Sequence, residues 1–294
     1  MGLFYSALEK ATQNAEAGSE PQAPAGDWKQ AEVRDLAGFP LPQAPPAATA
    51  ATEVVTEPAS LDPHSLSLVA NHAGIAKEQY RILRTRLLEA IATQGLRTLL
   101  ITSATAAEGK TIVSANLALQ FSSLKEGRVL LIDADLRRAG LSESLRPQPT
   151  RGLGEYLRGE SDWESLLLQV DPWLSVLPAV HSRTEGAELL TSQRLPELLQ
   201  QARTRFDLVL VDGAPVGPIA DSRVLARAVD ASVLVVRAGC TNFTAVEEAA
   251  ALLRPGLLGC VLNGAKLTKA RYGYGYSYIE DETAQEVAGG GTRA

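Results

Sequence analysis

The feature that most constrains the fold of this chain is the segment Ala104-Thr-Ala-Ala-Glu-Gly109-Lys110-Thr111, which directly follows the apolar run Leu99-Leu-Ile-Thr. Its spacing is that of a P-loop, in which a strand passes through a tight turn into a helix that opens with a lysine and a hydroxyl residue. The backbone N–H groups of such a turn and the positive end of the helix together cradle a polyphosphate. Lys110 is therefore expected to reach the β- and γ-phosphates of a nucleotide, and Thr111 to give its hydroxyl to Mg²⁺.

The rest of the composition narrows the class of protein. The chain has 294 residues, 45% of them hydrophobic, and a formal net charge of −6, which argues against broad nucleic-acid binding. Its two cysteines, Cys240 and Cys260, are expected to be reduced and structural, and its three histidines lack metal-ligand spacing. No apolar run approaches the roughly 18 residues of a membrane span, so we expect a cytoplasmic protein.

Four regions follow from the pattern along the chain. Residues 1–17 have apolar residues at helical spacing and are expected to form a short amphipathic helix that docks on a partner. Residues 18–69 are rich in proline and alanine and are expected to be a disordered linker. Residues 70–268 are expected to form the P-loop domain, and residues 269–294 a flexible tyrosine-rich tail.

Within the domain, near-continuous apolar strands alternate with helices. This pattern is typical of a parallel sheet covered on both faces, which predicts a doubly wound α/β fold with a mainly parallel sheet of the P-loop NTPase type. The expected strands are 97–103, 128–133, 173–178, 206–212, 230–237 and 257–263, and the expected longer helices are 75–93, 110–124 and 243–254.

Three carboxylates end two of these strands. Asp133 and Asp135 follow one strand and Asp212 ends another, and the carboxyl ends of parallel strands share one edge of the sheet, where ligands bind. Lys110 is expected at the same edge. Carboxylate oxygens are ligands that Mg²⁺ prefers, so the sequence predicts a site for Mg²⁺ and a nucleoside polyphosphate there.

Three motifs resemble those of the bacterial tyrosine kinase family, and the resemblance covers about residues 70–280. They are the second Walker motif Asp133-Ala-Asp135-Leu-Arg137-Arg138, the Walker B strand Leu-Val-Leu-Val-Asp212-Gly-Ala-Pro215, and the Glu-x-x-Arg-x-x-Arg oligomerisation pattern Glu78-Gln-Tyr-Arg81-Ile-Leu-Arg84. Two departures stand out: the P-loop has Ala106-Ala107-Glu108 where the family usually has Pro-Gly-Glu, and Gly213-Ala214 follow the Walker B aspartate where a hydroxyl residue is usual.

The resemblance implies the roles of the site residues. Asp133 is the expected base for a tyrosine hydroxyl, Asp135 and Asp212 support the metal, Arg137 stabilises phosphate charge and Asn263 touches the adenine edge. ATP and Mg²⁺ are the implied cofactors. The expected ATP-binding residues are Ala104, Thr105, Ala106, Ala107, Glu108, Gly109, Lys110, Thr111, Ile112 and Asn263.

The resemblance also implies partners. Such kinases regulate capsule or exopolysaccharide synthesis and export, which implies a homo-oligomer, with a ring as the expected form. It further implies a separate membrane-spanning activator of the polysaccharide co-polymerase type, an opposing tyrosine phosphatase, and a cytoplasmic location at the inner membrane through the partner. Two alternatives remain open: a ParA/MinD-like positioning ATPase, which would carry a lysine at the position of Thr105, and a catalytically weak, nucleotide-dependent scaffold.

Four tyrosines alternate with small residues near the C-terminus, in Tyr272-Gly-Tyr274-Gly-Tyr276-Ser-Tyr278. Next to a phosphoryl-transfer site, this pattern indicates an autophosphorylated tail, although an edge strand or a low-complexity tail would have the same sequence. Four phosphotyrosines would add roughly −6 to −8 of charge, so phosphorylation is expected to favour dissociation of the oligomer.

The helix that carries Glu78, Arg81 and Arg84 has two faces at 100° per residue. An apolar stripe of Tyr80, Leu83, Leu87 and Ile91 is expected to dock on the domain. The charged face is then expected to point outward, either to a neighbouring subunit or to solvent.

Overall fold

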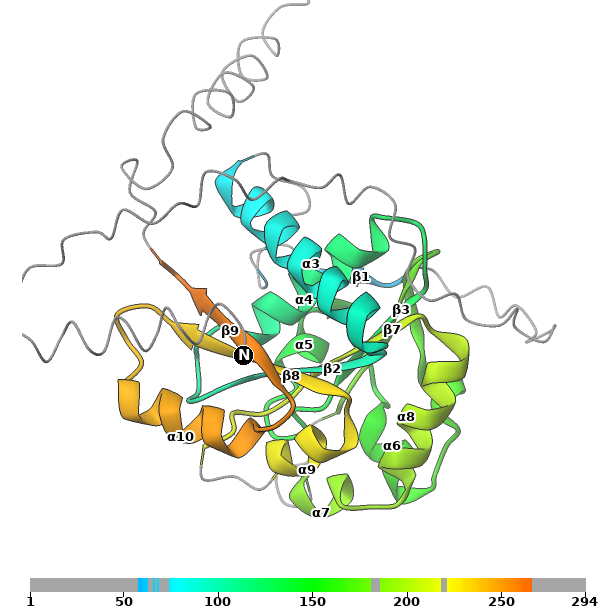
Figure 1. The fold of residues 1–294 in the computed structure, drawn as a ribbon. Coiled ribbons are helices and arrows are strands. Elements are labelled where there is room, and N and C mark those ends of the chain that lie inside the picture. The colour runs from blue at the N-terminus through cyan, green and yellow to red at the C-terminus, as the bar shows by residue number, and fades with distance from the viewer. Residues whose placement is uncertain are drawn as a thin grey trace, which may run out of the picture.

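A seven-stranded sheet forms the centre of the domain, with strand order β5-β6-β3-β7-β2-β8-β9 (Figure 1). This computed structural model describes residues 58–62, 66, 68, 74–180, 186–217 and 221–265. The strands are β2 (Thr98–Ser103), β3 (Val129–Asp133), β5 (Leu168–Asp171), β6 (Leu174–Leu177), β7 (Leu208–Asp212), β8 (Ala231–Arg237) and β9 (Leu257–Asn263). Every pair in the sheet is parallel except β5 with β6, which confirms the predicted mainly parallel α/β fold.

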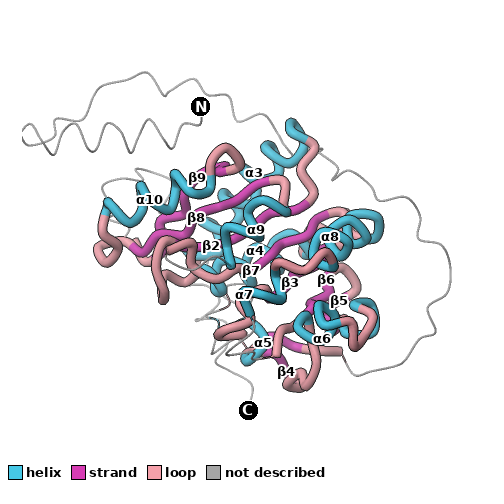
Figure 2. The backbone as a smooth tube through the Cα atoms, turned by 90° about the horizontal axis from the view of Figure 1, so that it is seen from below, coloured by secondary structure: helices cyan, strands magenta, loops and turns pink. Residues whose placement is uncertain are grey.

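Helices cover both faces of the sheet, because its central strands are apolar on both sides. On one face lie α3 (Ile75–Gln94), α4 (Lys110–Ser122) and α5 (Gly140–Glu143), which supply buried residues to one hydrophobic cluster. The other cluster takes residues from α6 (Leu153–Arg158), the short 3₁₀ helix η1 (Trp163–Leu166), α7 (Gly186–Leu190), α8 (Arg194–Arg205), α9 (Asp221–Ala228) and α10 (Phe243–Leu253). The view from below shows these helices around the sheet (Figure 2).

The sequence missed two strand pairs. The short strand β5 joins β6 in the antiparallel sense and forms one edge of the sheet. A separate two-stranded sheet pairs β1 (Ser60–Leu61) with β4 (Leu145–Arg146), and Leu66 and Leu68 are buried near it. The prediction that the linker is disordered up to residue 69 is therefore wrong in this part, because these leucines contribute to the core of the domain. The predicted helix at 1–17, the rest of the linker and the tail at 269–294 lie outside the described residues.

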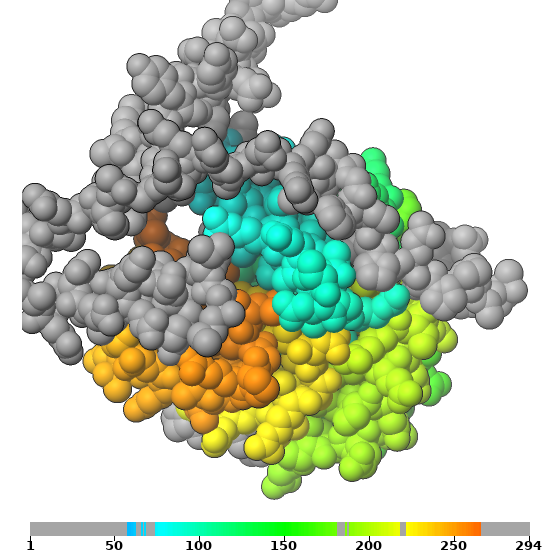
Figure 3. All heavy atoms as spheres, in the orientation of Figure 1, coloured from blue at the N-terminus to red at the C-terminus, as the bar shows by residue number. Residues whose placement is uncertain are grey.

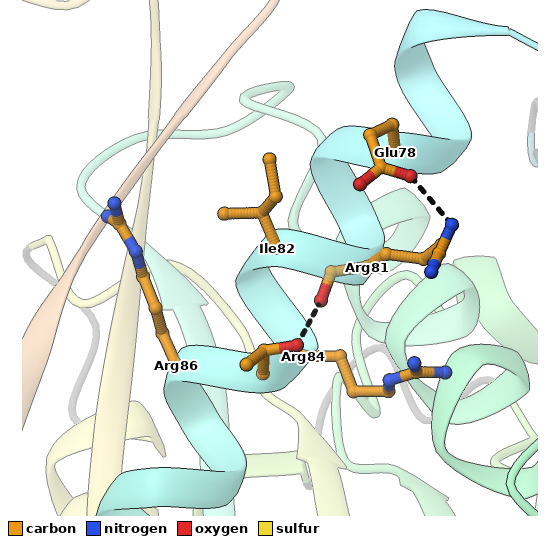
Figure 4. Close-up of a pocket in the computed structure, with 6 residues that line it drawn as sticks. Glu78, Arg81, Ile82, Arg84 and Arg86 are labelled. Carbon is orange, nitrogen blue, oxygen red and sulfur yellow. Dashed lines mark hydrogen bonds and ion pairs between the residues drawn. The ribbon is translucent and has the colours of Figure 1, made fainter. Parts of the chain in front are cut away.

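The apolar side of α3 docks on the domain as predicted, but Arg84 on its charged side is not placed as predicted. Leu87 and Ile91 are buried, and Tyr80 and Leu83 pack against the same cluster. The prediction that Arg84 faces outward with the other charged residues is wrong: its Nη1 donates to the carbonyl oxygen of Gln120 at 2.9 Å, near the end of α4. In Figure 4, Arg81 and Arg84 point to one side of the helix and Arg86 to the other.

Candidate functional site

The P-loop lies between β2 and α4, as the sequence predicted. Gly109 caps the helix with a φ of 89°, and its cap makes no side-chain hydrogen bond. A Cβ atom there would collide with the side-chain amide of Asn263, and residues with a Cβ rarely adopt a φ of +89°, so this position favours glycine. No acidic residue occupies the first turn of α4, which leaves the positive end of the helix available to a phosphate.

The three predicted carboxylates meet Lys110 at the carboxyl edge of the sheet. Asp133 and Asp212 are register partners on β3 and β7, and β2 follows β7 in the sheet. Nζ of Lys110 lies 2.8 Å from Oδ2 of Asp135 and 3.9 Å from Oδ1 of Asp212. Because all three carboxylates are buried, this is a concentrated site of negative charge with one cation among them.

Burial and mutual charge perturb the titration of these groups. Burial raises the pKa of Asp133 to about 7, and the nearby charge of Asp212 adds to the effect. Burial also raises the pKa of Asp212, although the charge of Lys110 and the Ser114 hydroxyl oppose it. For Lys110, burial lowers the pKa, but the charges of Asp212 and Asp135 outweigh burial and the net shift is upward. Lys110 therefore stays a cation at neutral pH.

Asp133 is held in a defined orientation. Its Oδ2 accepts two hydrogen bonds from Ser142, one from the backbone N–H at 2.9 Å and one from the hydroxyl at 2.7 Å. The same hydroxyl oxygen accepts a bond from the N–H of Ala179, which follows β6. Among the described residues, Oδ1 of Asp133 accepts one hydrogen bond, a long one of 3.2 Å from the N–H of Asp135, so it keeps a lone pair for another proton. Sequence reasoning missed Ser142, because nothing in its local pattern distinguishes it from other serines.

Distant segments brace the P-loop. Glu108 is buried, and its carboxylate accepts from the N–H of Ala104, from the Thr105 hydroxyl and, at 2.7 Å, from the hydroxyl of Thr241. Nδ2 of Asn263 donates to the carbonyl oxygen of Glu108 at 2.9 Å. Arg237 reaches the loop as well, with Nη1 at 3.2 Å from the carbonyl oxygen of Ala107. The ends of β8 and β9 therefore hold the shape of the turn.

Ala107 has a backbone conformation that suits glycine. Its φ is +64°, in the left-handed region that L-residues with a Cβ adopt only at a cost of about 1–2 kcal/mol. The side chain is exposed, so packing does not compensate. The turn thus needs a positive φ where this chain has alanine.

The site fits Mg²⁺ through a small number of protein ligands. Oδ2 of Asp212 is buried and has no hydrogen-bond partner among the described residues, so it is a carboxylate oxygen with an unused lone pair. The described part of the chain holds no group of three or more His, Cys, Asp or Glu residues that could coordinate a metal ion by themselves. Mg²⁺ commonly takes only one or two carboxylates and completes its shell with phosphate oxygens and water, which this donor set allows.

Three other predicted site residues, Arg137, Glu78 and Arg81, are exposed or half-exposed at the surface. Arg137 is exposed and lies next to Gly186 at the start of α7. Glu78 and Arg81 form an exposed ion pair of 2.9 Å on α3. The tyrosines 272, 274, 276 and 278 lie outside the described residues.

Comparison with known proteins identifies the family. Tyrosine-protein kinase YwqD of Bacillus subtilis is 36% identical over 202 residues, which cover 67% of this chain and 85% of YwqD. The chain belongs to the bacterial tyrosine kinase family. No protein-family model matches the sequence. The predicted resemblance is thereby confirmed, and the positioning-ATPase alternative is not favoured.

Two other family members are longer proteins, and the match covers a smaller share of their length. Tyrosine-protein kinase Etk of Escherichia coli is 35% identical over 214 residues, and the succinoglycan biosynthesis transport protein ExoP of Rhizobium meliloti is 32% identical over 230 residues. In both, the matched region is 29% of the relative and 71–72% of this chain. The solved kinase domain of Escherichia coli Etk superposes with a TM-score of 0.62 at 34% identity, covering 71% of this chain and 83% of that domain. The fold described above is therefore that of a bacterial tyrosine kinase domain.

Proposed function

We propose that this chain is an ATP-dependent protein-tyrosine autokinase that trans-phosphorylates its own tyrosine cluster, and so controls oligomer assembly and polysaccharide synthesis or export. The observation that carries the proposal is the meeting of Lys110, Asp133, Asp135 and Asp212 beside an uncapped helix N-terminus. A second is the sequence of the tail, with four tyrosines between residues 272 and 278. Family membership supplies the reaction class.

The residues of the chain divide the work of phosphoryl transfer. The N–H groups of the P-loop turn and of α4 bind the phosphates of ATP. The ammonium group of Lys110 contacts the β- and γ-phosphates and stabilises their negative charge. The hydroxyl of an incoming tyrosine attacks the γ-phosphorus, its proton passes to Oδ1 of Asp133, and ADP leaves. Ser142 holds Asp133 in place through Oδ2, which keeps Oδ1 free for that proton.

Mg²⁺ would be held by Asp212 and Asp135 with the hydroxyl of Thr111. When bound, it would neutralise charge on the phosphates. The unpartnered Oδ2 of Asp212 supports this assignment. Asn263 is proposed to contact the adenine edge in addition to its bond with Glu108, and Arg137 to stabilise phosphate charge from the rim of the site.

The charged face of α3 is proposed to contact a neighbouring copy. A shallow groove of about 230 Å³ lies on this face, lined by Glu78, Arg81, Ile82, Arg84, Thr85 and Arg86 (Figure 4). Ile82 is 37% exposed, so the groove has an apolar centre with charged walls. Such a surface is suited to a subunit contact in a ring, in which one copy presents its tail to the active site of the next.

The cellular setting is part of the proposal. Among the described residues, no helix has the length and apolar character needed to cross a bilayer. ExoP is named a transport protein of succinoglycan biosynthesis, which supports a role in polysaccharide export. We propose that residues 1–17 bind a separate membrane-spanning activator at the inner membrane, and that a tyrosine phosphatase resets the tail.

The deciding experiment is a phosphate map of the full chain. Dephosphorylated protein is incubated with Mg-ATP, with and without the cytoplasmic segment of a candidate membrane activator, and analysed by mass spectrometry. We expect phosphate on the tail tyrosines, lost in Lys110→Ala and retained in Lys125→Ala, which removes an exposed lysine beyond the end of α4. ATP turnover with unmodified tyrosines would instead indicate a positioning ATPase, and neither turnover nor phosphate would indicate a scaffold.

A second assay tests the direction of transfer. Lys110→Ala protein, which cannot use ATP in this scheme, is mixed with active chains whose four tail tyrosines are replaced by phenylalanine. Phosphate that appears on the Lys110→Ala chains demonstrates transfer between copies. A failure here, with normal autophosphorylation of the unaltered chain, would show that the tail reacts in its own active site.

A further inference from the structure

The outer edge of β9 has no paired strand among the residues that the structure describes. Among the described strands, β9 pairs only with β8, and Figures 1 and 2 show it at the end of the sheet. Its seven residues, Leu257–Asn263, include no charged residue and no proline, the usual devices that block pairing with another strand. The opposite edge, β5, has only four residues and ends in Asp171.

The backbone geometry identifies which groups of β9 face outward. The carbonyl oxygen of Asn263 accepts from the N–H of Ala238 beyond β8, so the backbone of Asn263 faces β8. Because successive residues of a strand point their backbone groups to opposite sides, Val261 also faces β8, and the N–H groups of Cys260 and Leu262 lie on the free edge. This edge presents hydrogen-bonding groups in the spacing of a strand.

An apolar surface accompanies the free edge. Leu262 is 60% exposed, the most exposed of the large hydrophobic residues in the described part of the chain. It lies two residues from Cys260, which packs against the cluster beneath α10, so both side chains belong to the α10 face. Phe243, at the start of α10, is 40% exposed. Figure 3 shows orange atoms of the C-terminal part of the domain next to the cyan atoms of α3.

We propose that the chain's own segment Tyr272–Tyr278 adds to β9 as an antiparallel edge strand. The described chain continues for only two residues after β9, so the tyrosine segment is tethered to the edge that it would cover. Residues 264–271 are long enough to reverse the direction of the chain, and Gly264 begins them with a φ of +70°. The segment has seven residues, the same length as β9.

The side-chain pattern of the segment fits this edge. Strict alternation of tyrosine with glycine or serine places all four tyrosines on one face of an extended strand. Tyrosine favours pleated, half-buried surfaces, and on the α10 face the rings would cover Leu262. Antiparallel pairing also carries Glu280, Asp281 and Glu282 toward the start of β9, where the exposed Arg254 supplies opposite charge.

The docked strand would store the tail in its unphosphorylated form, a consequence that rests on the proposed kinase function. Side chains two apart on a strand lie about 7 Å apart, less than the Debye length of about 8–10 Å at physiological salt. Phosphotyrosines there, each with a charge of about −1.5 to −2, would repel one another strongly. Phosphorylation would thus release the segment and expose the edge of β9.

Hydrogen exchange resolved to single amides tests the docking on dephosphorylated full-length protein. We expect the Leu262 amide to be protected, and about tenfold or more of that protection to be lost in Tyr274→Pro, which removes one of the N–H groups that face β9 when the tyrosines lie on the Leu262 face. Tyr274→Phe, which keeps this N–H and the aromatic ring, is the matched control and should leave Leu262 unchanged. The Val261 amide, which faces β8, serves as the internal reference and should stay protected in every sample.

Three results would overturn the proposal. The first is a Leu262 amide that exchanges at its unprotected rate in the unaltered chain, and the second is protection that survives Tyr274→Pro. Protection that rises with protein concentration would assign the added strand to a second copy instead. The assay uses no ATP, so its outcome is independent of whether the chain is a kinase.

Discussion

The positive φ of Ala107 leads to a quantitative prediction about the P-loop. An L-residue at φ +64° loses about 1–2 kcal/mol relative to the right-handed regions, a penalty that glycine avoids. Glycine in turn gains freedom in the unfolded chain, which lowers stability by about 0.4–1 kcal/mol. We therefore expect Ala107→Gly to raise the free energy of unfolding by about 0.5–1 kcal/mol, which corresponds to roughly 1–4 °C in Tm for a domain of this size.

Ala106 supplies a matched control in the same turn. It is also exposed, and it is not among the residues with positive φ, so Ala106→Gly adds unfolded-state freedom without relieving strain. The control should lower the free energy of unfolding by about 0.4–1 kcal/mol. Subtracting the two effects isolates the backbone strain, because both variants remove one exposed methyl group from neighbouring positions.

The assay is urea unfolding of both variants and the unaltered chain, without nucleotide, with equal m-values as the requirement for comparison. If Ala107→Gly destabilises the protein as much as Ala106→Gly, the strain argument is refuted. The same pair can be compared for ADP affinity by calorimetry, where a turn relieved of strain should bind at least as tightly as the original.

Three further predictions follow from the site and from α3. Thr241→Val removes a hydrogen bond to the buried carboxylate of Glu108, so it should lower the free energy of unfolding by about 1–3 kcal/mol in chemical denaturation and weaken ADP binding. Arg84→Ala should lower the free energy of unfolding of the monomer by about 1–2 kcal/mol, because it removes a hydrogen bond to α4. Arg81→Ala breaks an exposed ion pair and should change the free energy of unfolding by less than about 1 kcal/mol. Its effect should instead be a change of oligomeric mass in light scattering. Asp212→Asn should abolish the Mg²⁺ dependence of ADP affinity in calorimetry, and a variant that still binds more tightly with Mg²⁺ would remove Asp212 from the metal site.

Local patterns predicted the sheet and the central cluster well. The apolar strands ending in Asp133 and Asp212, and the loop before Lys110, lie within a residue or two of their expected bounds. This success has a physical cause: parallel strands buried on both faces are continuous apolar runs, and their carboxyl ends must share one edge. In the sheet, β7 lies between β3, which ends at Asp133, and β2, which leads into the P-loop.

Contacts between distant segments could not be read from the sequence. Arg84 differs from Arg81 only in its position on α3. Its partner is the backbone carbonyl of Gln120, and a backbone group cannot be predicted from the pattern of side chains. Ser142 and Thr241 are ordinary polar residues until the fold brings them to Asp133 and Glu108. The short antiparallel strand β5 was missed for a related reason, because four residues carry too little periodicity to distinguish a strand from a loop.

The bracing of the P-loop has a consequence for how the protein is made. The Glu108 carboxylate accepts a hydrogen bond from Thr241, which lies 133 positions later in the chain. The carbonyl oxygen of Glu108 accepts one from Asn263, which lies 155 positions later. During synthesis from the N-terminus, the phosphate-binding turn therefore leaves the ribosome well before the residues that shape it. A nascent chain that ends before β9 cannot hold nucleotide as the finished domain does, so tight ADP retention reports that the last strand has joined the sheet.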